Sequence, residues 1–142
     1  MKARREDDKD LQTVTFLLTN APYDDEKFLN ALELAKKLIT PKRNEVNIFL
    51  LGDAVTAAKK DQKTPEGYDN AEKILVELIE QRVRVLVCGP CLNSRGLNKD
   101  DLVEGIELGS MEDLVKIAKE SSKLLRENSD ASEVDFASIS SS

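Results

Sequence analysis

Short runs of hydrophobic residues alternate along the chain with stretches in which hydrophobic positions recur every three or four residues. The runs at residues 14–18, 46–51 and 83–87 are rich in branched and aromatic side chains, which is typical of strands buried on both faces of a sheet. A shorter run at residues 106–108 is expected to form a brief fourth strand. Because helical and strand periods follow each other repeatedly, the pattern predicts an α/β domain with a mostly parallel sheet.

Three helices are expected between and after these strands. Pro41 ends the first one, since proline cannot continue a helix. Asp69 and Glu72 have the spacing of a capping box and are predicted to begin the second helix. Ser110 and Asp113 have the same spacing and are predicted to begin the third. The buried faces are predicted to be Phe28, Leu32, Ala35 and Ile39 in the first helix, Ile74, Leu75, Leu78 and Ile79 in the second, and Met111, Leu114, Val115 and Ala118 in the third.

Two segments between the strands have weaker patterns. A short helical turn at residues 54–58 is expected to lead into a polar loop at residues 59–69, which contains a proline and a glycine. Further along the chain, Asn98 and Asp101 have the spacing to cap a short helix that continues through residue 103.

The chain of 142 residues is long enough for one hydrophobic core and too short for two. Residues 1–10 are almost all charged and residues 128–142 are polar and serine-rich, so both ends are expected to be disordered. We therefore predict a single three-layer α/β/α domain over residues 11–127, with a mostly parallel sheet of about five strands. In such sheets, ligands and chemistry collect at the carboxyl ends of the strands.

Composition and charge exclude several classes of function. The net charge is −6 and basic residues are not concentrated anywhere, which argues against a nucleic-acid partner. No hydrophobic run approaches the roughly 18 residues of a membrane span, and the charged N-terminus does not resemble a signal peptide. Two cysteines are too few for a secreted disulfide framework. These features predict a cytoplasmic protein without a membrane partner.

Both cysteines lie in the stretch VLVCGPCLNSRGL, residues 85–97, at the end of the third predicted strand. Cys88 ends that strand, and Gly52 and Asp53 follow the second, so all three are expected at the same edge of the sheet. Histidine is absent, which excludes a Cys–His dyad, and two thiols alone cannot complete a tetrahedral zinc site. We therefore expect no metal and no cofactor, although a carboxylate or a second subunit that joined the two thiols would provide the missing zinc ligands.

Cys88 has an inert and a reactive interpretation. Cysteine is often buried as a small core residue, and the end of a hydrophobic strand is a suitable place for one. Three features favour a reactive thiol: Cys91 is within disulfide reach, Gly89 and the proline after it shape the turn, and Arg95 follows closely. The Arg95 guanidinium and the N–H groups of the turn are expected to lower the pKa of the Cys88 thiol. The alternative for Arg95 is an arginine that only faces solvent or an interface.

The letters CGPC also occur in thiol-disulfide oxidoreductases of the thioredoxin kind. A thioredoxin has an aromatic residue before this motif and a proline later in the chain, whereas here Val87 precedes Cys88 and no proline follows Pro90. Tryptophan is absent as well. The context argues against a thioredoxin, and a CxxC oxidoreductase or redox sensor stays as the alternative function.

The longer string CGPCLNSRGL, with VRVLV before it and FLLGDAV earlier in the chain, resembles the DsrE/DsrF-like family of sulfur-relay proteins. The resemblance extends from Val14 to about Arg126. In the subgroup that is most similar, the thiol segment has the form CGxCxxxRGL. The residues that match it are Cys88, Gly89, Cys91, Arg95, Gly96 and Leu97.

This resemblance implies that Cys88 carries sulfane sulfur, as a persulfide or thiosulfonate, between donor and acceptor proteins or small sulfane-sulfur compounds. It leaves the role of Cys91 open: this thiol attacks the Cys88 persulfide and releases the sulfur, or it has no essential part. The resemblance also implies a homotrimer, a hexamer, or a hetero-oligomer with paralogues. A non-catalytic structural subunit of a sulfur-transfer complex is a further alternative.

Further residues receive expectations from the same resemblance. Arg95 would stabilise the thiolate or persulfide anion of Cys88. From their positions in the chain, Gly52, Asp53, Gln62 and Gly89 are expected to border the pocket. The alternative for Asp53 is to cap the turn that follows it, because an aspartate after a glycine commonly binds a nearby backbone N–H group. The family also places a strand at residues 123–126, where periodicity alone continues the third helix as far as Leu125.

Overall fold

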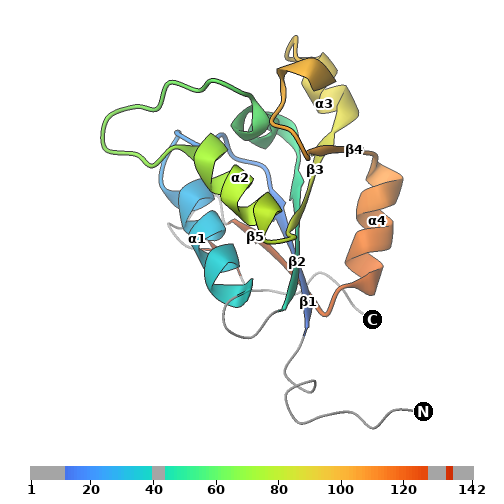
Figure 1. Ribbon diagram of the computed structural model, residues 1–142. Helices are drawn as coiled ribbons and strands as arrows, with labels where there is room; N and C mark the ends of the chain where they lie inside the picture. The colour runs from blue at the N-terminus through green and yellow to red at the C-terminus, as the bar shows by residue number, and fades with distance from the viewer. Residues whose placement is uncertain (1–11, 40–43, 128–133, 136–142) are drawn as a thin grey trace, which may run out of the picture.

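The computed structural model describes residues 12–39, 44–127 and 134–135, and their six strands form one sheet (Figure 1). The strands are β1 (Thr13–Leu18), β2 (Glu45–Leu50), β3 (Arg84–Cys88), β4 (Glu107–Gly109), β5 (Lys123–Glu127) and β6 (Val134–Asp135). Their order across the sheet is β4-β3-β2-β1-β5-β6. Strands β1 to β5 are parallel, and β6 pairs with β5 in the antiparallel direction. The α/β class and the parallel sheet of five strands are confirmed, and β6 extends that sheet at one edge.

Helices cover both faces of the sheet. Helices α1 and α2 lie together on one face and α4 lies on the other (Figure 1), so the domain has the three expected layers. In the described part of the chain, no helix is long and apolar enough to cross a membrane. The helices are α1 (Lys27–Ile39), η2 (Gly52–Ala58), α2 (Ala71–Glu80), α3 (Gly89–Asn93), η3 (Lys99–Asp101) and α4 (Met111–Glu120), where η denotes a 3₁₀ helix.

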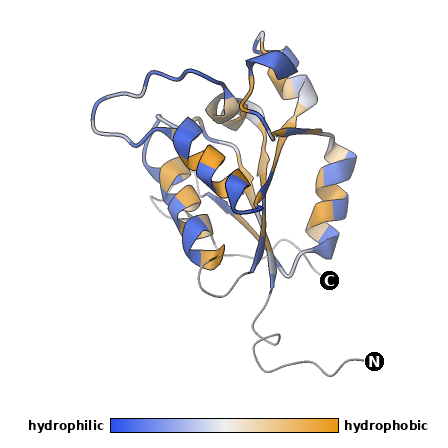
Figure 2. Ribbon diagram, viewed as in Figure 1, coloured by the Kyte–Doolittle hydropathy of each residue, from blue (hydrophilic) through white to orange (hydrophobic). Residues whose placement is uncertain are grey.

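The hydrophobic core lies between the sheet and the inward faces of the helices. Phe16 of β1, Phe28 of α1 and Phe49 of β2 have no exposed surface. In Figure 2 the central strands are hydrophobic, and α1 and α2 carry hydrophobic and hydrophilic residues on different sides. Burying one large side chain contributes roughly 1.5–3 kcal/mol. This packing fixes the positions of the strand ends, where the thiols lie.

The start of α2 differs from the prediction. Asn70 is its N-cap, and the Asn70 side chain accepts a hydrogen bond from the Lys73 N–H group. The predicted capping box of Asp69 and Glu72 is wrong. The Glu72 carboxylate accepts a hydrogen bond from the N–H group of Gln62 at 3.0 Å, so it holds the preceding loop instead of capping its own helix.

The two other predicted capping boxes are confirmed, with Asn98 at the start of η3 and Ser110 at the start of α4. However, η3 ends at Asp101 and does not continue through residue 103. The next residue is extended because it forms a β-bridge with Lys59. The helical turn expected at residues 54–58 is part of η2.

Residues 123–126 belong to β5, as the family resemblance implies, and do not continue α4. The helix ends at Glu120, and the hydroxyl of its C-cap residue Ser121 donates to the carbonyl of Ile117 at 2.7 Å. The same hydroxyl contacts the Thr15 hydroxyl of β1 at 2.6 Å. These contacts bring the chain alongside β1, so Leu125 lies in the sheet and not on a helix.

The buried face of α4 is narrower than predicted. Ile117 is 5% exposed, whereas Met111 is 60% exposed and Val115 is 53% exposed. Leu108 of the neighbouring strand β4 is 48% exposed. We call Leu108, Met111 and Val115 the α4 patch. The prediction that Met111 and Val115 are buried is wrong for the single chain, because α4 turns only the opposite part of its hydrophobic surface toward the sheet.

Glu127, the last residue of β5, is a buried carboxylate at the carboxyl edge of the sheet. Its Oε1 accepts hydrogen bonds from the N–H groups of Thr19 and Asn20 and from the Thr19 hydroxyl. Its Oε2 has no hydrogen-bond partner among the described residues. Burial raises the pKa of Glu127, and the hydrogen bonds from Thr19 and Asn20 oppose this only in part.

The stability of the fold is expected to depend on pH through Glu127. A carboxyl group with a raised pKa stabilises the fold in its protonated form, and this contribution is lost as pH rises through the folded-state pKa. A Glu127→Gln variant keeps the acceptor oxygen and cannot ionise. Its free energy of unfolding, from urea titrations, is expected to exceed that of the wild type more at about pH 7 than at about pH 4. Glu66→Gln, at an exposed position, is the control, and an equal difference at both pH values would contradict the account.

Candidate thiol site

Cys88 is the last residue of β3 and also the N-cap of α3. Helix α3 begins directly after it, and Pro90 is accommodated in the first helical turn because an N–H group there has no partner within the helix. One turn further, the Cys91 N–H group points back at Cys88 Sγ, with an N–S distance of 3.4 Å. The two sulfur atoms are in contact at 2.7 Å, and both cysteines are free thiols.

The second thiol is held by the neighbouring strand. Because β2 lies beside β3, the turn that follows β2 is next to α3. The N–H group of Gly52 donates to Cys91 Sγ at 3.3 Å. Gly52 has a φ of +60°, a left-handed conformation that side chains rarely adopt, so glycine is suited to this turn. The residues that follow β2 and β3 therefore hold Cys91 Sγ in contact with Cys88 Sγ.

Arg95 connects α3 to η2, and its side chain donates hydrogen bonds to oxygen atoms of Asp53, Cys91 and Ser94. Its Nε and Nη2 donate to Asp53 Oδ1 at 3.1 and 2.7 Å, and its Nη1 donates to the Cys91 carbonyl at 3.0 Å. The expectation that Asp53 caps the turn after it is wrong, because this carboxylate binds Arg95 and η2 has no side-chain cap. Arg95 and Asp53 together position the backbone that carries Cys91.

The glycine and leucine of the RGL segment end this local structure. Gly96 has a φ of +71°, which reverses the chain after α3. The Leu97 N–H group then donates to the Leu92 carbonyl at 3.0 Å, and Leu97 packs against the hydrophobic core. Each residue of the segment therefore has a structural role. Arg95 joins α3 to Asp53, Gly96 reverses the chain, and Leu97 packs against the hydrophobic core.

The environment of Cys88 raises the pKa of its thiol. Burial is the main cause, since Cys88 is only 6% exposed, and the adjacent Cys91 thiol adds to it. The Cys91 N–H group lowers the pKa, and the charge of Arg95 lowers it least. The expectation that this pKa falls below its ordinary value is wrong, because burial and the neighbouring thiol outweigh the Cys91 N–H group and the charge of Arg95. The resting pair is a buried, protonated Cys88 beside a half-buried Cys91.

Gln62 and Gly89, the other expected pocket residues, have different places. The Gln62 side chain accepts from the Tyr23 hydroxyl and donates to the carbonyls of Ala57 and Lys59, so it holds its own loop. Gly89 is the first residue of α3 and borders a hollow of about 410 Å³ that Leu108 of the α4 patch also lines. The structure thus brings Cys88, Cys91, Gly52, Asp53 and Arg95 together at the carboxyl edge of the sheet. Gln62 lies apart from them, in the polar loop after η2.

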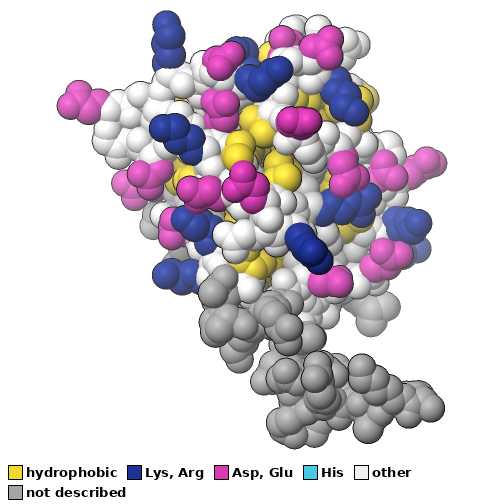
Figure 3. All heavy atoms as spheres, in the orientation of Figure 1, with side chains coloured by type: hydrophobic (Ala, Val, Ile, Leu, Met, Phe, Trp, Pro, Cys, Tyr) yellow, Lys and Arg dark blue, Asp and Glu magenta, His cyan; other side chains and the backbone are white. Residues whose placement is uncertain are grey.

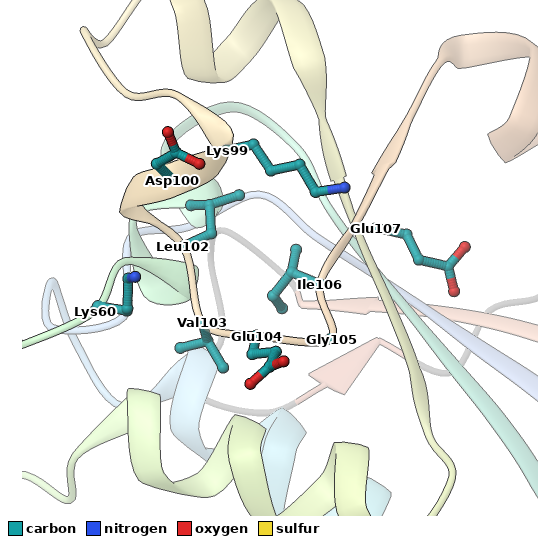
Figure 4. A pocket seen from close by; sticks show the side chains of 9 residues that line it. All are labelled: Lys60, Lys99, Asp100, Leu102, Val103, Glu104, Gly105, Ile106 and Glu107. Carbon is teal, nitrogen blue, oxygen red and sulfur yellow. The ribbon is translucent and has the colours of Figure 1, made fainter.

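A hollow of about 880 Å³ lies on a different part of the surface (Figure 4). Figure 4 shows hydrophobic side chains of one loop in this hollow and charged side chains around them. Figure 3 shows hydrophobic side chains among charged ones on the face of the molecule seen in Figure 1. Neither cysteine lines the hollow, so it is not the thiol site. The residues that line the hollow are Lys60, Lys99, Asp100, Leu102, Val103, Glu104, Gly105, Ile106 and Glu107.

Among the described residues, no group of three or more histidines, cysteines or acidic residues is placed to hold a metal ion.

Arg95 is expected to act on Cys88 through its charge. Replacing it by glutamine removes the positive charge and is expected to slow alkylation of Cys88 by iodoacetamide at about pH 8 by roughly twofold to threefold. Asp53→Asn is the matched control, because it breaks the same ion pair and keeps the guanidinium charge. Equal slowing in both variants would mean that Arg95 acts only by holding the backbone.

These observations define an α/β protein with two free thiols in contact at the carboxyl edge of a parallel sheet. The chain belongs to the DsrE/DsrF-like family, whose sequence profile matches residues 12–126.

Several proteins are similar over nearly their whole length. The protein MJ0989 of Methanocaldococcus jannaschii is 41% identical over 111 residues, which cover 78% of this chain and 96% of that protein. YchN of Escherichia coli is 34% identical over 116 residues, covering 81% and 98%. The crystal structure of YchN superposes with a TM-score of 0.76 at 33% identity, covering 82% of this chain and 99% of that one. The structure of MTH1491 from Methanobacterium thermoautotrophicum, with a TM-score of 0.67 and 22% identity, shares the fold.

Proposed function

We propose that the protein is a sulfur-relay protein that accepts sulfane sulfur on Cys88 and holds it as a persulfide or thiosulfonate for an acceptor. Membership of the DsrE/DsrF-like family supports a role in sulfur relay in general. The observation that carries the specific proposal is the position of Cys88. Cys88 is the last residue of β3, an interior strand of the sheet, and the residue is 6% exposed. Its Sγ accepts a hydrogen bond from the Cys91 N–H group of α3.

Ordinary thiol exchange supplies the mechanism. The Cys88 thiolate attacks the sulfane sulfur of a donor in line with the bond that breaks, and the donor's own thiolate or sulfinate leaves. An acceptor thiolate then attacks the outer sulfur, and Cys88 leaves as a thiolate. The Cys91 N–H group, 3.4 Å from Cys88 Sγ, stabilises the negative charge on Cys88 when it leaves.

Burial of Cys88 has two opposite effects on this relay. It slows loading at neutral pH because the raised pKa keeps the thiol protonated. It also keeps the inner sulfur away from oxidants and unrelated thiols in solution, while the outer sulfur of a persulfide extends one bond further toward the surface. The arrangement therefore favours small sulfane-sulfur donors, or a donor cysteine on a protruding loop, over a donor in a flat surface.

The α4 patch favours assembly of the chain. Hydrophobic residues scattered singly on a surface are ordinary, whereas Met111 and Val115, one turn apart on the same face of α4, and Leu108 of the preceding strand form a candidate interface. Leu108 also lines the hollow beside α3, so a subunit that covers the patch lies close to the thiol site. We therefore propose a homotrimer or hexamer, or a hetero-oligomer with paralogues, in the cytoplasm, with sulfur donors and acceptors as partners and no nucleic acid.

The contact between the two sulfurs favours a second candidate, a CxxC thiol-disulfide oxidoreductase. The experiment that separates the two is anaerobic exposure of Cys91→Ser to a thiosulfonate, followed by alkylation and mass spectrometry, with the wild type exposed to protein disulfides and to the thiosulfonate in parallel. A sulfur atom attached to Cys88 supports the relay. A disulfide that forms with protein disulfides but never with sulfane-sulfur donors supports the oxidoreductase.

A further inference from the structure

We propose that the thiol pair has a second activity, the reductive release of the bound sulfur as hydrosulfide, with Cys91 as the group that attacks the Cys88 persulfide. This activity rests on the proposed function, since it requires sulfur on Cys88. It gives the carried sulfur a second exit that needs no acceptor protein.

The geometry provides the attacking group. Cys91 Sγ is 2.7 Å from Cys88 Sγ, so it contacts the inner sulfur of a Cys88 persulfide directly. The Gly52 N–H group at 3.3 Å and the helical backbone of α3 hold Cys91 in this position. Arg95 fixes the Cys91 carbonyl as well. A nucleophile that is already in contact with its target has a large effective concentration compared with a thiol in solution.

The chemistry balances without an external oxidant. Cys91 loses its proton and its thiolate attacks Cys88 Sγ, a sulfur–sulfur bond forms between the two cysteines, and the bond from Cys88 Sγ to the outer sulfur breaks. The outer sulfur leaves with the electron pair and takes up a proton as hydrosulfide. The sulfane sulfur is thereby reduced, and the two cysteine sulfurs are oxidised to a disulfide.

A dithiol reductant must then restore the pair. Cys91 is half-buried and Cys88 is buried, so the reductant's thiolate reaches Cys91 first. It forms a mixed disulfide there, and Cys88 leaves as a thiolate beside the Cys91 N–H group. The second thiol of the reductant resolves the mixed disulfide. One cycle therefore consumes one sulfane sulfur and one dithiol and produces one hydrosulfide.

The test uses benzenethiosulfonate as the probe. When it transfers its sulfane sulfur to the protein, the leaving group is benzenesulfinate, so sulfide that is measured afterwards comes from sulfur bound to the protein. Reduced full-length protein is exposed to it anaerobically without added thiol, and sulfide and intact mass are followed in time. The wild type is expected to release one equivalent of sulfide per chain and to lose two hydrogens. In Cys91→Ser the sulfur is expected to stay on Cys88, with release at least about 100-fold slower. Asn93→Ala, an exposed position on α3, is the matched control and is expected to behave like the wild type.

Two results separate failure of this inference from failure of the proposed function. If the wild type and Cys91→Ser keep the sulfur equally long, Cys91 does not release it, and the relay function stands. If Cys91→Ser shows no sulfur on Cys88 at any time, the relay function itself is wrong, and the release activity falls with it.

Discussion

In a chain that already carries Cys91→Ser, replacing Cys88 by serine is expected to abolish loading of sulfane sulfur, with a loss of at least about 100-fold relative to Cys91→Ser alone. A serine hydroxyl is a far weaker nucleophile toward sulfur than a thiolate. Serine is also a good N-cap residue, so α3 is expected to keep its start and the fold its stability. Incorporation of labelled sulfur from a thiosulfonate, followed on denatured and desalted protein, measures the loss.

The pH dependence of loading gives a second readout of the same group. Because the pKa of Cys88 is raised, its thiolate fraction increases as pH rises over the whole range from about pH 7 to about pH 9. The loading rate of Cys91→Ser is expected to increase over that range without reaching a plateau. A plateau near neutral pH would show that Cys88 ionises easily, which the buried site in this structure does not allow.

Replacing Met111 and Val115 by aspartate is expected to convert an oligomer into monomers. Covering each of these exposed side chains with a partner subunit contributes roughly 1.5–3 kcal/mol, and a buried unpaired carboxylate costs several kcal/mol. The combined effect raises the dissociation constant at least about 100-fold. Sedimentation velocity across a range of protein concentrations measures the assembly.

A control separates loss of hydrophobic contact from added charge. Lys116→Asp changes the net charge by the same amount as the double variant, and successive helical residues point about 100° apart, so it lies beside the α4 patch and not within it. This variant is expected to assemble like the wild type. A wild type that is already monomeric, or a double variant of unchanged mass, would show that the α4 patch is not an interface between subunits.

Strands β1, β2 and β3 could be predicted from the sequence because each is a local signal, whereas periodicity alone missed β5. Residues 14–18, 46–51 and 83–87 are largely hydrophobic runs with one polar residue each, and a run of that kind is buried in almost any arrangement of a parallel sheet. Capping boxes at Asn98 and Ser110 are local as well, since each is contained within four residues. The α2 cap failed for the opposite reason: Gln62, ten residues away, binds Glu72 and leaves Asn70 to cap the helix.

The site was only partly predictable, because its decisive contacts join distant parts of the chain. Cys88 and Cys91 follow from the motif, but the Arg95–Asp53 pair spans 42 residues and is formed only when β2 and β3 lie side by side. The raised pKa of Cys88 results from burial by the assembled core, which no local pattern measures. The same holds for Glu127, whose burial depends on the pairing of β5 with β1. The expectations for residues 1–10 and for most of 128–142 lie outside the described residues.

The most direct test of the central claim is the mass of the Cys91→Ser variant after anaerobic treatment with benzenethiosulfonate. Removing Cys91 blocks release, so a persulfide on Cys88 is expected to accumulate. Fragmentation is expected to place one additional sulfur atom on the peptide that contains Cys88, and a dithiol is expected to remove it as sulfide. An unchanged mass under conditions that convert a small-molecule thiol into its persulfide would contradict the account, because Cys88 would then carry no sulfur.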